Sequence, residues 1–330
     1  MKDKIERIDR ALEKLSGHET ECTLCPRECR VDRTGGAAGI CQTGSAAAMS
    51  RALLHYGEEP AISGCSDWTQ AKAKKNVRGA GSGTIFFAGC NLKCLFCQNY
   101  QLSWLMEGKE VSDQELADLM LGLQDQGALN INLVSPSHVI PPILRALRLA
   151  YSRGLDLPIV YNSNGYEKAD VIRLLEGIID LYLPDLKYFS PAISQKYSGA
   201  ADYFRWASAA VEEMYLQQPA LVLDDEEIAR RGLILRHLVL PGQVEDSLAI
   251  LEWVRRNLSA AVCLSLMSQY HPCFRAPQEL QRDLTPGEYE TVVSRAQELG
   301  FEHLLIQPVR FKSDEHLVPD FRRNDPFKWE

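Results

Sequence analysis

The chain has 330 residues, of which 45% are hydrophobic and 24% are charged, and its formal net charge is -8 at pH 7. This length and composition suit one large α/β domain or two smaller ones, and they exclude disorder over most of the chain. The acidic net charge argues against a nucleic-acid partner, because a broad nucleic-acid-binding face would have to be basic.

Residues 1–17 place charged and apolar residues at helical spacing and predict an amphipathic helix. The segment lacks the apolar core of a signal peptide, and no apolar run in the chain approaches the length of a membrane span. We therefore expect a soluble cytoplasmic protein with no membrane partner. In the cytosol, clustered cysteines are more often metal ligands or redox groups than disulfides.

The first cysteine set consists of Cys22, Cys25, Cys29 and Cys41, spaced C-x2-C-x3-C-x11-C. Four thiolates suit either a structural zinc or an auxiliary iron–sulfur cluster, and free thiols in a loop are the alternative without a metal. A zinc would stabilise a segment that has few apolar residues, whereas an auxiliary cluster could relay electrons. Residues 1–80 show little other sign of strands, so we predict a Cys-rich N-terminal extension.

Short apolar runs alternate with helical patterns beyond residue 80. The runs predict buried parallel strands at 84–89, 130–135, 158–164, 180–187, 233–240, 262–270 and 303–308. The patterns predict helices at 112–126, 140–152, 167–177, 202–217, 244–257 and 286–299. This alternation indicates right-handed βαβ units and one parallel sheet. We predict an α/β fold, a partial parallel (β/α)6 TIM-like barrel over 81–310, followed by an irregular tail at 311–330. A doubly wound open sheet is the alternative.

The second cysteine set, Cys90, Cys94 and Cys97, follows the first predicted barrel strand with the spacing C-x3-C-x2-C. Three thiolates in a tight loop suit a cubane 4Fe–4S cluster, and the loop offers no fourth ligand for a structural zinc. The alternative is three buried structural cysteines, which are usually scattered rather than set at fixed short gaps. Three ligands leave one iron of a cube open, and an open position on a metal is where chemistry can occur.

Polar residues interrupt the apolar runs near the ends of the predicted strands, which in a barrel meet at one mouth. They include Asn130, Asn132, Ser135, Ser137, His138, Ser163, Asn164, Asp185, Lys187, Arg236, His237, Ser268, Gln269, Tyr270 and Gln307. Structural roles compete with a site role: Asn164 could belong to a plain Asn-Gly turn, Asp185 and Lys187 could pair with each other, and His237 could be a hydrogen-bonded core residue. Because side chains alternate along a strand, Arg236 and His237 face opposite sides.

The string "CNLKCLFC" resembles the signature of the radical S-adenosylmethionine (SAM) superfamily. Residues from about 80 to 310 resemble pyruvate formate-lyase activating enzyme and its homologues. "FFAGCNLKCLFCQNYQLSW" resembles the cluster loop of that family, and "YNSNGY" (161–166), "LPDLK" (183–187) and "RHLVLPG" (236–242) resemble its strand ends. The chain departs from the family at the second strand, where "NINLVSPSH" stands in place of a Gly-Gly-Glu-Pro stretch.

This resemblance implies a 4Fe–4S cluster on Cys90, Cys94 and Cys97, with SAM chelating the open iron. It implies reductive cleavage of SAM to a 5′-deoxyadenosyl radical that abstracts hydrogen from a substrate, with reduced flavodoxin or ferredoxin as the electron donor. The residues expected to bind SAM are Asn132, Ser135, Ser137, Asn164, Asp185, Lys187 and His237.

The resemblance favours an activase that makes a glycyl radical on a protein or peptide partner. A radical SAM enzyme that modifies a peptide or a small molecule is an alternative within the same chemistry. A non-catalytic iron–sulfur electron-transfer protein is an alternative of another class. A pure electron carrier, however, would not need the polar strand ends.

Overall fold

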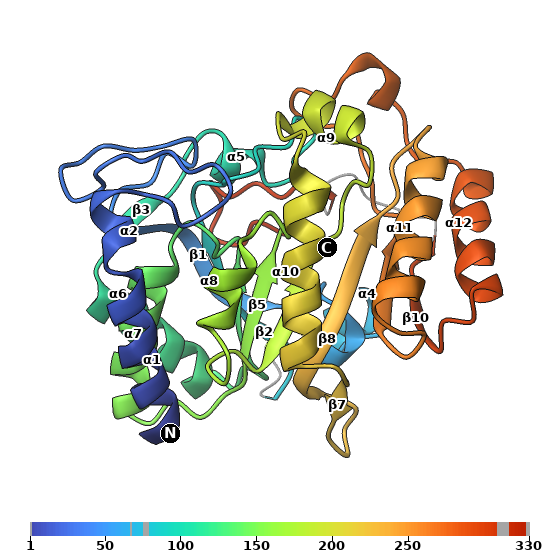
Figure 1. Ribbon diagram of the computed structural model, residues 1–330. Coiled ribbons are helices and arrows are strands. Elements are labelled where there is room, and N and C mark those ends of the chain that lie inside the picture. The colour runs from blue at the N-terminus through green and yellow to red at the C-terminus, as the bar shows by residue number, and fades with distance from the viewer. Residues whose placement is uncertain (1, 67, 75–78, 309–316, 328–330) are drawn as a thin grey trace.

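The computed structural model describes residues 2–66, 68–74, 79–308 and 317–327 (Figure 1). Its helices are α1 (Lys2–Leu15), α2 (Gly17–Thr20), α3 (Pro60–Ser63), α4 (Trp68–Lys74), α5 (Tyr100–Ser103), α6 (Asp113–Asp125), α7 (Ile140–Ser152), α8 (Ala169–Arg173), α9 (Pro191–Ser198), α10 (Tyr203–Gln217), α11 (Val244–Asn257), α12 (Pro286–Glu298) and the 3-10 helix η1 (Gln278–Leu280). Its strands are β1 (Ala47–His55), β2 (Ser82–Phe87), β3 (Lys109–Val111), β4 (Ile131–Val134), β5 (Ile159–Ser163), β6 (Leu181–Pro184), β7 (Val222–Leu223), β8 (Ala229–Leu238), β9 (Cys263–Met267) and β10 (His303–Ile306).

One sheet holds these strands in the order β10-β9-β8-β6-β5-β4-β2-β1-β3, with β7 paired to β8. The pairs from β2 to β10 along this order are parallel, whereas β1 pairs antiparallel with both β2 and β3. The sheet ends at β10 and β3 in the described part of the chain, so it is an open barrel rather than a closed one. The carboxyl ends of its parallel strands therefore lie at one mouth.

Alternation along the strands separates an apolar barrel floor from a polar mouth. Val160 and Ile234 form an inner cluster with Ile62 of α3, and this cluster occupies the lower part of the barrel. Two residues further along the same strands, Asn162 and Arg236 lie on the same face at the mouth. In both strands, the inward-facing residue near the amino end is buried, and the inward-facing residue near the carboxyl end lines a cavity.

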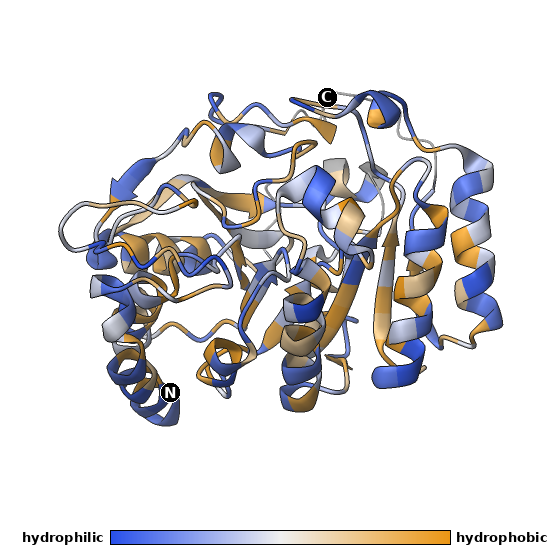
Figure 2. Cartoon of the chain, turned by 45° about the horizontal axis from the view of Figure 1, so that its top comes forward, coloured by the Kyte–Doolittle hydropathy of each residue, from blue (hydrophilic) through white to orange (hydrophobic). Residues whose placement is uncertain are grey.

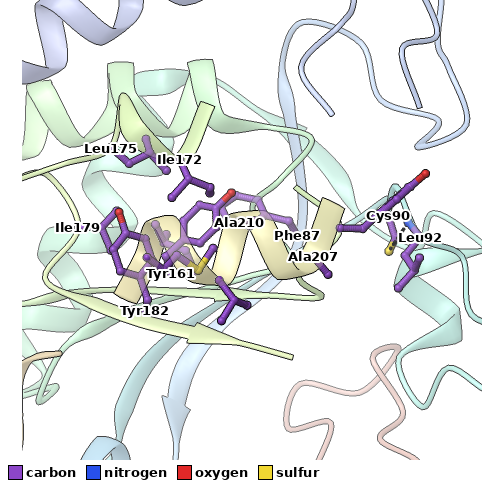
Figure 3. Packing of buried hydrophobic residues seen from close by; sticks show 14 of the residues in the cluster. Phe87, Cys90, Leu92, Tyr161, Ile172, Leu175, Ile179, Tyr182, Ala207 and Ala210 are labelled. Atoms are coloured by element: carbon purple, nitrogen blue, oxygen red, sulfur yellow. Dashed lines mark hydrogen bonds between the residues drawn. The ribbon is translucent and has the colours of Figure 1, made fainter. Parts of the chain in front are cut away.

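The outer face of the sheet is covered by helices. Tyr161 and Tyr182 pack edge to face with their ring centroids 6.1 Å apart, against Ile172 and Ala210 of α8 and α10 (Figure 3). Along the helices, hydrophobic residues lie toward the sheet and hydrophilic residues face outward (Figure 2). This burial fixes the strands, and therefore the positions of the residues at their ends.

The predicted parallel partial barrel is confirmed by this sheet. Strand β1 lies inside the extension and was not predicted, because "AAMSRALLH" lacks the two-residue alternation of a half-buried strand. In the described part of the chain, every helix is too short or too polar to cross a membrane.

Candidate functional site

A cavity of about 250 Å³ opens at the carboxyl ends of the barrel strands. Its wall on one side is the loop after β2, with Cys90, Cys94 and Cys97. The opposite wall is charged and polar, formed by Glu58, Asn162, Asp185, Lys187 and Arg236, and Asn164 contacts the cysteine loop. Met267, Gln269 and the tail residues Leu317, Pro319 and Phe327 complete the lining together with apolar side chains. The structure thus gathers the three-cysteine loop and most of the strand ends at one place.

The cysteine loop begins with a tight turn. Gly89 has a φ of +90°, and a Cβ at this position would lie 2.6 Å from the carbonyl oxygen of Cys41 and 2.8 Å from Nε2 of His138. Only glycine allows this close approach. The extension therefore packs directly against Gly89, the residue before the first cysteine of the loop, Cys90. Lys93, between the first two ligands, has a φ of +60° and turns the chain back toward Cys94.

Hydrogen-bond donors lie close to the sulfurs of the loop. The Asn164 amide nitrogen lies 3.4 Å from the Cys90 sulfur, and the Ser198 hydroxyl oxygen lies 3.2 Å from the Cys94 sulfur. The Tyr188 hydroxyl oxygen is 3.6 Å from the Cys94 sulfur. Such donors stabilise negative charge on sulfur, which is the form that binds iron.

Burial disfavours the ionised form of Cys90 and of Cys97. Burial raises the pKa of Cys97 to about 12, and the neighbouring Cys94 raises it further. Burial and Cys94 likewise raise the pKa of Cys90. Because a thiolate must replace each thiol on metal binding, cluster assembly at this loop releases protons.

The donor set fits a 4Fe–4S cube. Each cysteine of a cube binds a different iron, so the sulfurs line a common space rather than converge on one point. In the described residues no group of three His, Cys, Asp or Glu side chains is arranged to hold a single metal ion, at either cysteine set. The buried Ser103 hydroxyl lines the same cavity, and its interaction with the Cys97 sulfur favours the thiolate that an iron would bind.

A buried ion network forms the opposite wall. Nε of Arg236 lies 2.9 Å from Asp185 Oδ1, and Nζ of Lys187 lies 2.6 Å from Asp185 Oδ2. Burial alone would raise the pKa of Asp185, but Arg236 and Lys187 outweigh it and lower the pKa. Asp185 therefore stays ionised and holds both cations against the cavity.

Glu58 joins this network from the loop after β1. It accepts a hydrogen bond of 3.0 Å from the Asn132 amide and lies 3.5 Å from the Arg236 guanidinium. Burial raises the pKa of Glu58, and Arg236 offsets this only in part. Glu58 and its neighbour Glu59 belong to no sequence motif that indicates a functional site. Their sequence therefore did not predict that Glu58 reaches the cavity.

The structure brings four of the seven predicted SAM-binding residues to the cavity: Ser135, Asn164, Asp185 and Lys187. Asn132 lies one layer behind the cavity, where it binds Glu58. Ser137 is buried away from the cavity and donates a hydrogen bond of 2.5 Å to Glu167.

His237 is also absent from the cavity lining. Its Nδ1 lies 2.7 Å from the carbonyl oxygen of Leu186, and its Nε2 lies 2.8 Å from the Ser247 hydroxyl. Burial lowers its pKa to about 4, so it is neutral near pH 7. Strand alternation turns His237 outward and Arg236 inward, so Arg236 is the residue of this strand that reaches the cavity.

The N-terminal extension supports the cysteine loop. The Arg27 guanidinium donates to the carbonyl oxygens of Asn91 (2.9 Å), Leu92 (3.2 Å), Ser198 (2.9 Å) and Gly199 (2.6 Å). This fork ties the cysteine loop to the end of α9. Four carbonyl acceptors around one guanidinium need its planar set of donors, which lysine does not have.

The first cysteine set lies in the same extension. Cys22, Cys25 and Cys41 are buried, and Cys29 is half-buried. Burial raises the pKa of Cys25 to about 12, and Cys41 and Cys22 raise it further, so these three thiols are close neighbours. Nη2 of Arg33 lies 3.1 Å from the Cys41 sulfur, and the Ile40 amide nitrogen lies 3.5 Å from the Cys29 sulfur. A metal on this set stays a prediction.

Comparison with known proteins gives three kinds of likeness. Residues 84–215 match the family model of the Radical SAM superfamily. The uncharacterized proteins MJ0674 and MJ0808 of Methanocaldococcus jannaschii are 28% and 22% identical to this chain, over 291 and 294 residues. Each alignment covers 85% of this chain, and 75% and 78% of the respective relative.

Two solved structures are similar at low identity. They are Streptococcus suis SuiB (11% identity, TM-score 0.43, covering 69% of this chain) and methylornithine synthase, PylB (13% identity, TM-score 0.44, covering 68% of this chain). The chain spans 48% of the SuiB chain and 70% of the PylB chain. On the match over residues 84–215, this chain carries a radical SAM superfamily domain, which implies a 4Fe–4S cluster and S-adenosylmethionine.

Proposed function

We propose that this protein is a radical SAM enzyme that removes a hydrogen atom from a substrate held in the barrel cavity. One observation carries the proposal. The loop with Cys90, Cys94 and Cys97 opens into the same cavity as the charged strand ends at Asp185 and Lys187. A protein that only carries electrons would have no need for buried charges beside its cluster.

The chain's own residues would hold the cofactors as follows. Cys90, Cys94 and Cys97 would bind three irons and leave the fourth iron without a protein ligand, open to SAM. When bound and reduced, the cluster and SAM together supply a 5′-deoxyadenosyl radical, which abstracts hydrogen from the substrate. Lys187 would bind a carboxylate at the cavity, because Asp185 fixes its ammonium group at 2.6 Å.

The cavity also keeps the reaction away from water. Cys90, Cys94 and Asp185 are each only 8% exposed, and Phe96 and Leu92 are buried beside the cysteines. A reactive carbon radical would otherwise take hydrogen from any group within reach, so enclosure directs it to the bound substrate. Tail residues Leu317, Pro319 and Phe327 contribute to this enclosure.

The finer proposal is an activase that forms a glycyl radical on a partner protein. Its support is the resemblance of "FFAGCNLKCLFCQNYQLSW", "LPDLK" and "RHLVLPG" to pyruvate formate-lyase activating enzyme. Reduced flavodoxin or ferredoxin would serve as the electron donor. An enzyme that modifies a peptide or a small molecule would use the same site. A substrate of that kind would replace the activase proposal.

The test uses the full chain, purified without oxygen and reconstituted with iron and sulfide. Incubation with SAM and dithionite is expected to yield 5′-deoxyadenosine and methionine in equal amounts. A cluster that forms and is reduced without any 5′-deoxyadenosine would overturn the enzyme proposal and favour an electron-transfer protein. Addition of a candidate partner should then produce a glycyl radical signal in electron paramagnetic resonance (EPR) if the activase proposal is right.

A further inference from the structure

A second hollow, of about 630 Å³, lies on the outer side of the cysteine loop. We call it the basic groove. Lys93 and Leu95 of the loop line it, together with Trp104, Arg27 of the extension and Lys196 of α9. Lys93 and Leu95 belong to the same loop as the three cysteines. The cysteines line the cavity of the proposed reaction, which lies on the other side of this loop from the basic groove.

The charge of this groove is opposite to that of the molecule. Arg27, Lys93 and Lys196 are cationic, and no acidic side chain belongs to the lining found in the described residues. Arg275 adds a fourth cation, with its guanidinium 5.2 Å from the centre of the Trp104 ring. Of these four, Lys196 alone forms an ion pair within the described structure, with Glu279 at 2.6 Å. Arg27 already donates to four carbonyl oxygens, and Lys93 is buried and donates to the Gln42 side chain. The exposed positive charge of the groove therefore lies on Lys196 and Arg275 at its rim. The whole chain, in contrast, has a net charge of -8.

The groove is connected to the cluster ligands through Trp104. Its indole N–H donates a hydrogen bond of 3.0 Å to the carbonyl oxygen of Cys94. The same ring stacks beneath two cations, with the Lys93 ammonium 5.4 Å and the Arg275 guanidinium 5.2 Å from its centre. An electron that arrives at this ring crosses one hydrogen bond and the atoms of Cys94 to reach a ligand sulfur.

We propose that the basic groove is the docking surface for an acidic one-electron carrier protein. The proposal rests on the proposed function, because it requires a reducible cluster on the cysteine loop. In the transfer, the carrier loses one electron and the cluster gains it, and no covalent bond forms or breaks. On an acidic protein, a cationic groove attracts an acidic carrier to one place, while the remaining surface repels it. Short-lived redox encounters of this kind use small contacts.

The test compares two ways of reducing the same enzyme. The variant Lys196→Glu/Arg275→Glu reverses two exposed charges at the rim of the groove. The matched control, Lys14→Glu/Arg256→Glu, makes the same charge change at exposed positions on α1 and α11. The rate of 5′-deoxyadenosine formation is measured with a purified, fully reduced acidic flavodoxin and, separately, with dithionite.

We expect the groove variant to lose about tenfold or more of its flavodoxin-driven rate at low salt, because steering by charge contributes about this much to association. Its dithionite-driven rate should match that of the wild type, and the control variant should match the wild type with both reductants. The flavodoxin-driven rate of the wild type should fall as salt is raised, and that of the groove variant should fall less.

Two results would overturn the docking proposal. One is a flavodoxin-driven rate for the groove variant that equals the wild-type rate at low salt. The other is an equal loss with dithionite, which would place the effect on the cluster instead of on docking. If the wild type itself forms no 5′-deoxyadenosine with dithionite, the failure lies with the proposed function and not with the groove.

Discussion

Asp185 and Arg236 are joined twice at the mouth of the barrel. Their backbones form a parallel bridge that extends the pairing of β6 with β8, and their side chains lie 2.9 Å apart. Asp185 is buried and the Arg236 side chain is only 14% exposed, so little water is available to compensate either charge for loss of the other. The polar wall of the cavity therefore depends on this contact.

Replacement of Arg236 by Met should destabilise the protein by about 3–5 kcal/mol, because it leaves Glu58 buried without its cation and Asp185 with Lys187 alone. The loss should be larger at pH 8 than at pH 5, since both carboxyl groups can take up protons at low pH. Chemical unfolding of the metal-free protein measures both effects. Arg231→Met, at an exposed position on the same strand, is the control and should change stability by about 0.5 kcal/mol or less. Equal losses for the two variants would refute the role of the buried network.

Replacement of Cys94 by Ala should abolish the cluster of the loop and all cleavage of SAM, because a cube held by two thiolates on this loop lacks a ligand. Iron and sulfide analysis, EPR after reduction and 5′-deoxyadenosine formation check this. Cys263→Ala removes another buried thiol, from β9, and should retain the cluster. SAM cleavage by the Cys94 variant would show that the ligands are assigned incorrectly.

Replacement of Cys25 by Ala should lower stability without removing the cluster of the other loop. Cys25 is buried beside Cys22 and Cys41, so any metal held by this set would be lost. Metal analysis of the variant against the wild type reports which metal, zinc or iron, has gone. If this variant lost both the reducible cluster and SAM cleavage, the assignment would be reversed. The first cysteine set, and not Cys90, Cys94 and Cys97, would then hold the cluster that cleaves SAM.

Arg27 offers a test of the contact between the extension and the cysteine loop. Arg27→Gln removes donors to four carbonyl oxygens, and hydrogen bonds from a charged group contribute about 1.5–3 kcal/mol each. The variant should unfold at lower denaturant concentration and retain less iron. Arg27→Lys should recover only part of the loss, because lysine keeps the charge without the fork. Arg30→Gln removes an exposed pair with Glu21 and should cost about 1 kcal/mol or less. An iron content equal to that of the wild type in Arg27→Gln would argue against this support.

Glu167 predicts a pH dependence of stability. Burial raises its pKa from 4.5 to about 7, although Ser137, Tyr161 and Ser163 hydrogen-bond to its carboxyl group. The folded state therefore binds more protons than the unfolded state between these values. The associated stability is fully present below pH 4.5, and is lost as the pH rises through 7. The difference corresponds to about 3 kcal/mol.

The measurement is denaturant unfolding of the wild type and of Glu167→Gln at pH 5 and pH 8. Glutamine keeps the size of the side chain and does not titrate, so the fall in stability between the two pH values should be smaller by about 3 kcal/mol. Identical pH profiles for the two proteins would show that Glu167 does not have a raised pKa.

The sequence contained enough information to predict the parallel barrel and the cysteine loop, because both depend on local patterns. Apolar runs at strand length predicted the sheet, and the spacing of Cys90, Cys94 and Cys97 predicted that three thiols lie together on one loop. Their binding of a cluster stays a prediction. Alternation along "LILRHLVL" even separated Arg236 from His237, but did not show which of the two faces inward. That choice depends on which neighbouring residues form the floor of the barrel.

Residues that reach the cavity from outside the strands could not be predicted in this way. Glu58 enters from a loop after β1, and Phe327 comes from the tail. Their contacts with Arg236 and Phe86 join parts of the chain that are far apart in sequence. No local period encodes such contacts, because they arise only when the barrel has formed.

The Arg27 fork has a consequence for the order of assembly during synthesis. Its acceptors on Ser198 and Gly199 lie 171 and 172 residues further along the chain. On the ribosome, the segment with the first cysteine set emerges early but must wait for α9 before it can dock. The cysteine loop is also exposed during this interval. We therefore expect metal delivery to either set to produce a stable product only after α9 has been made.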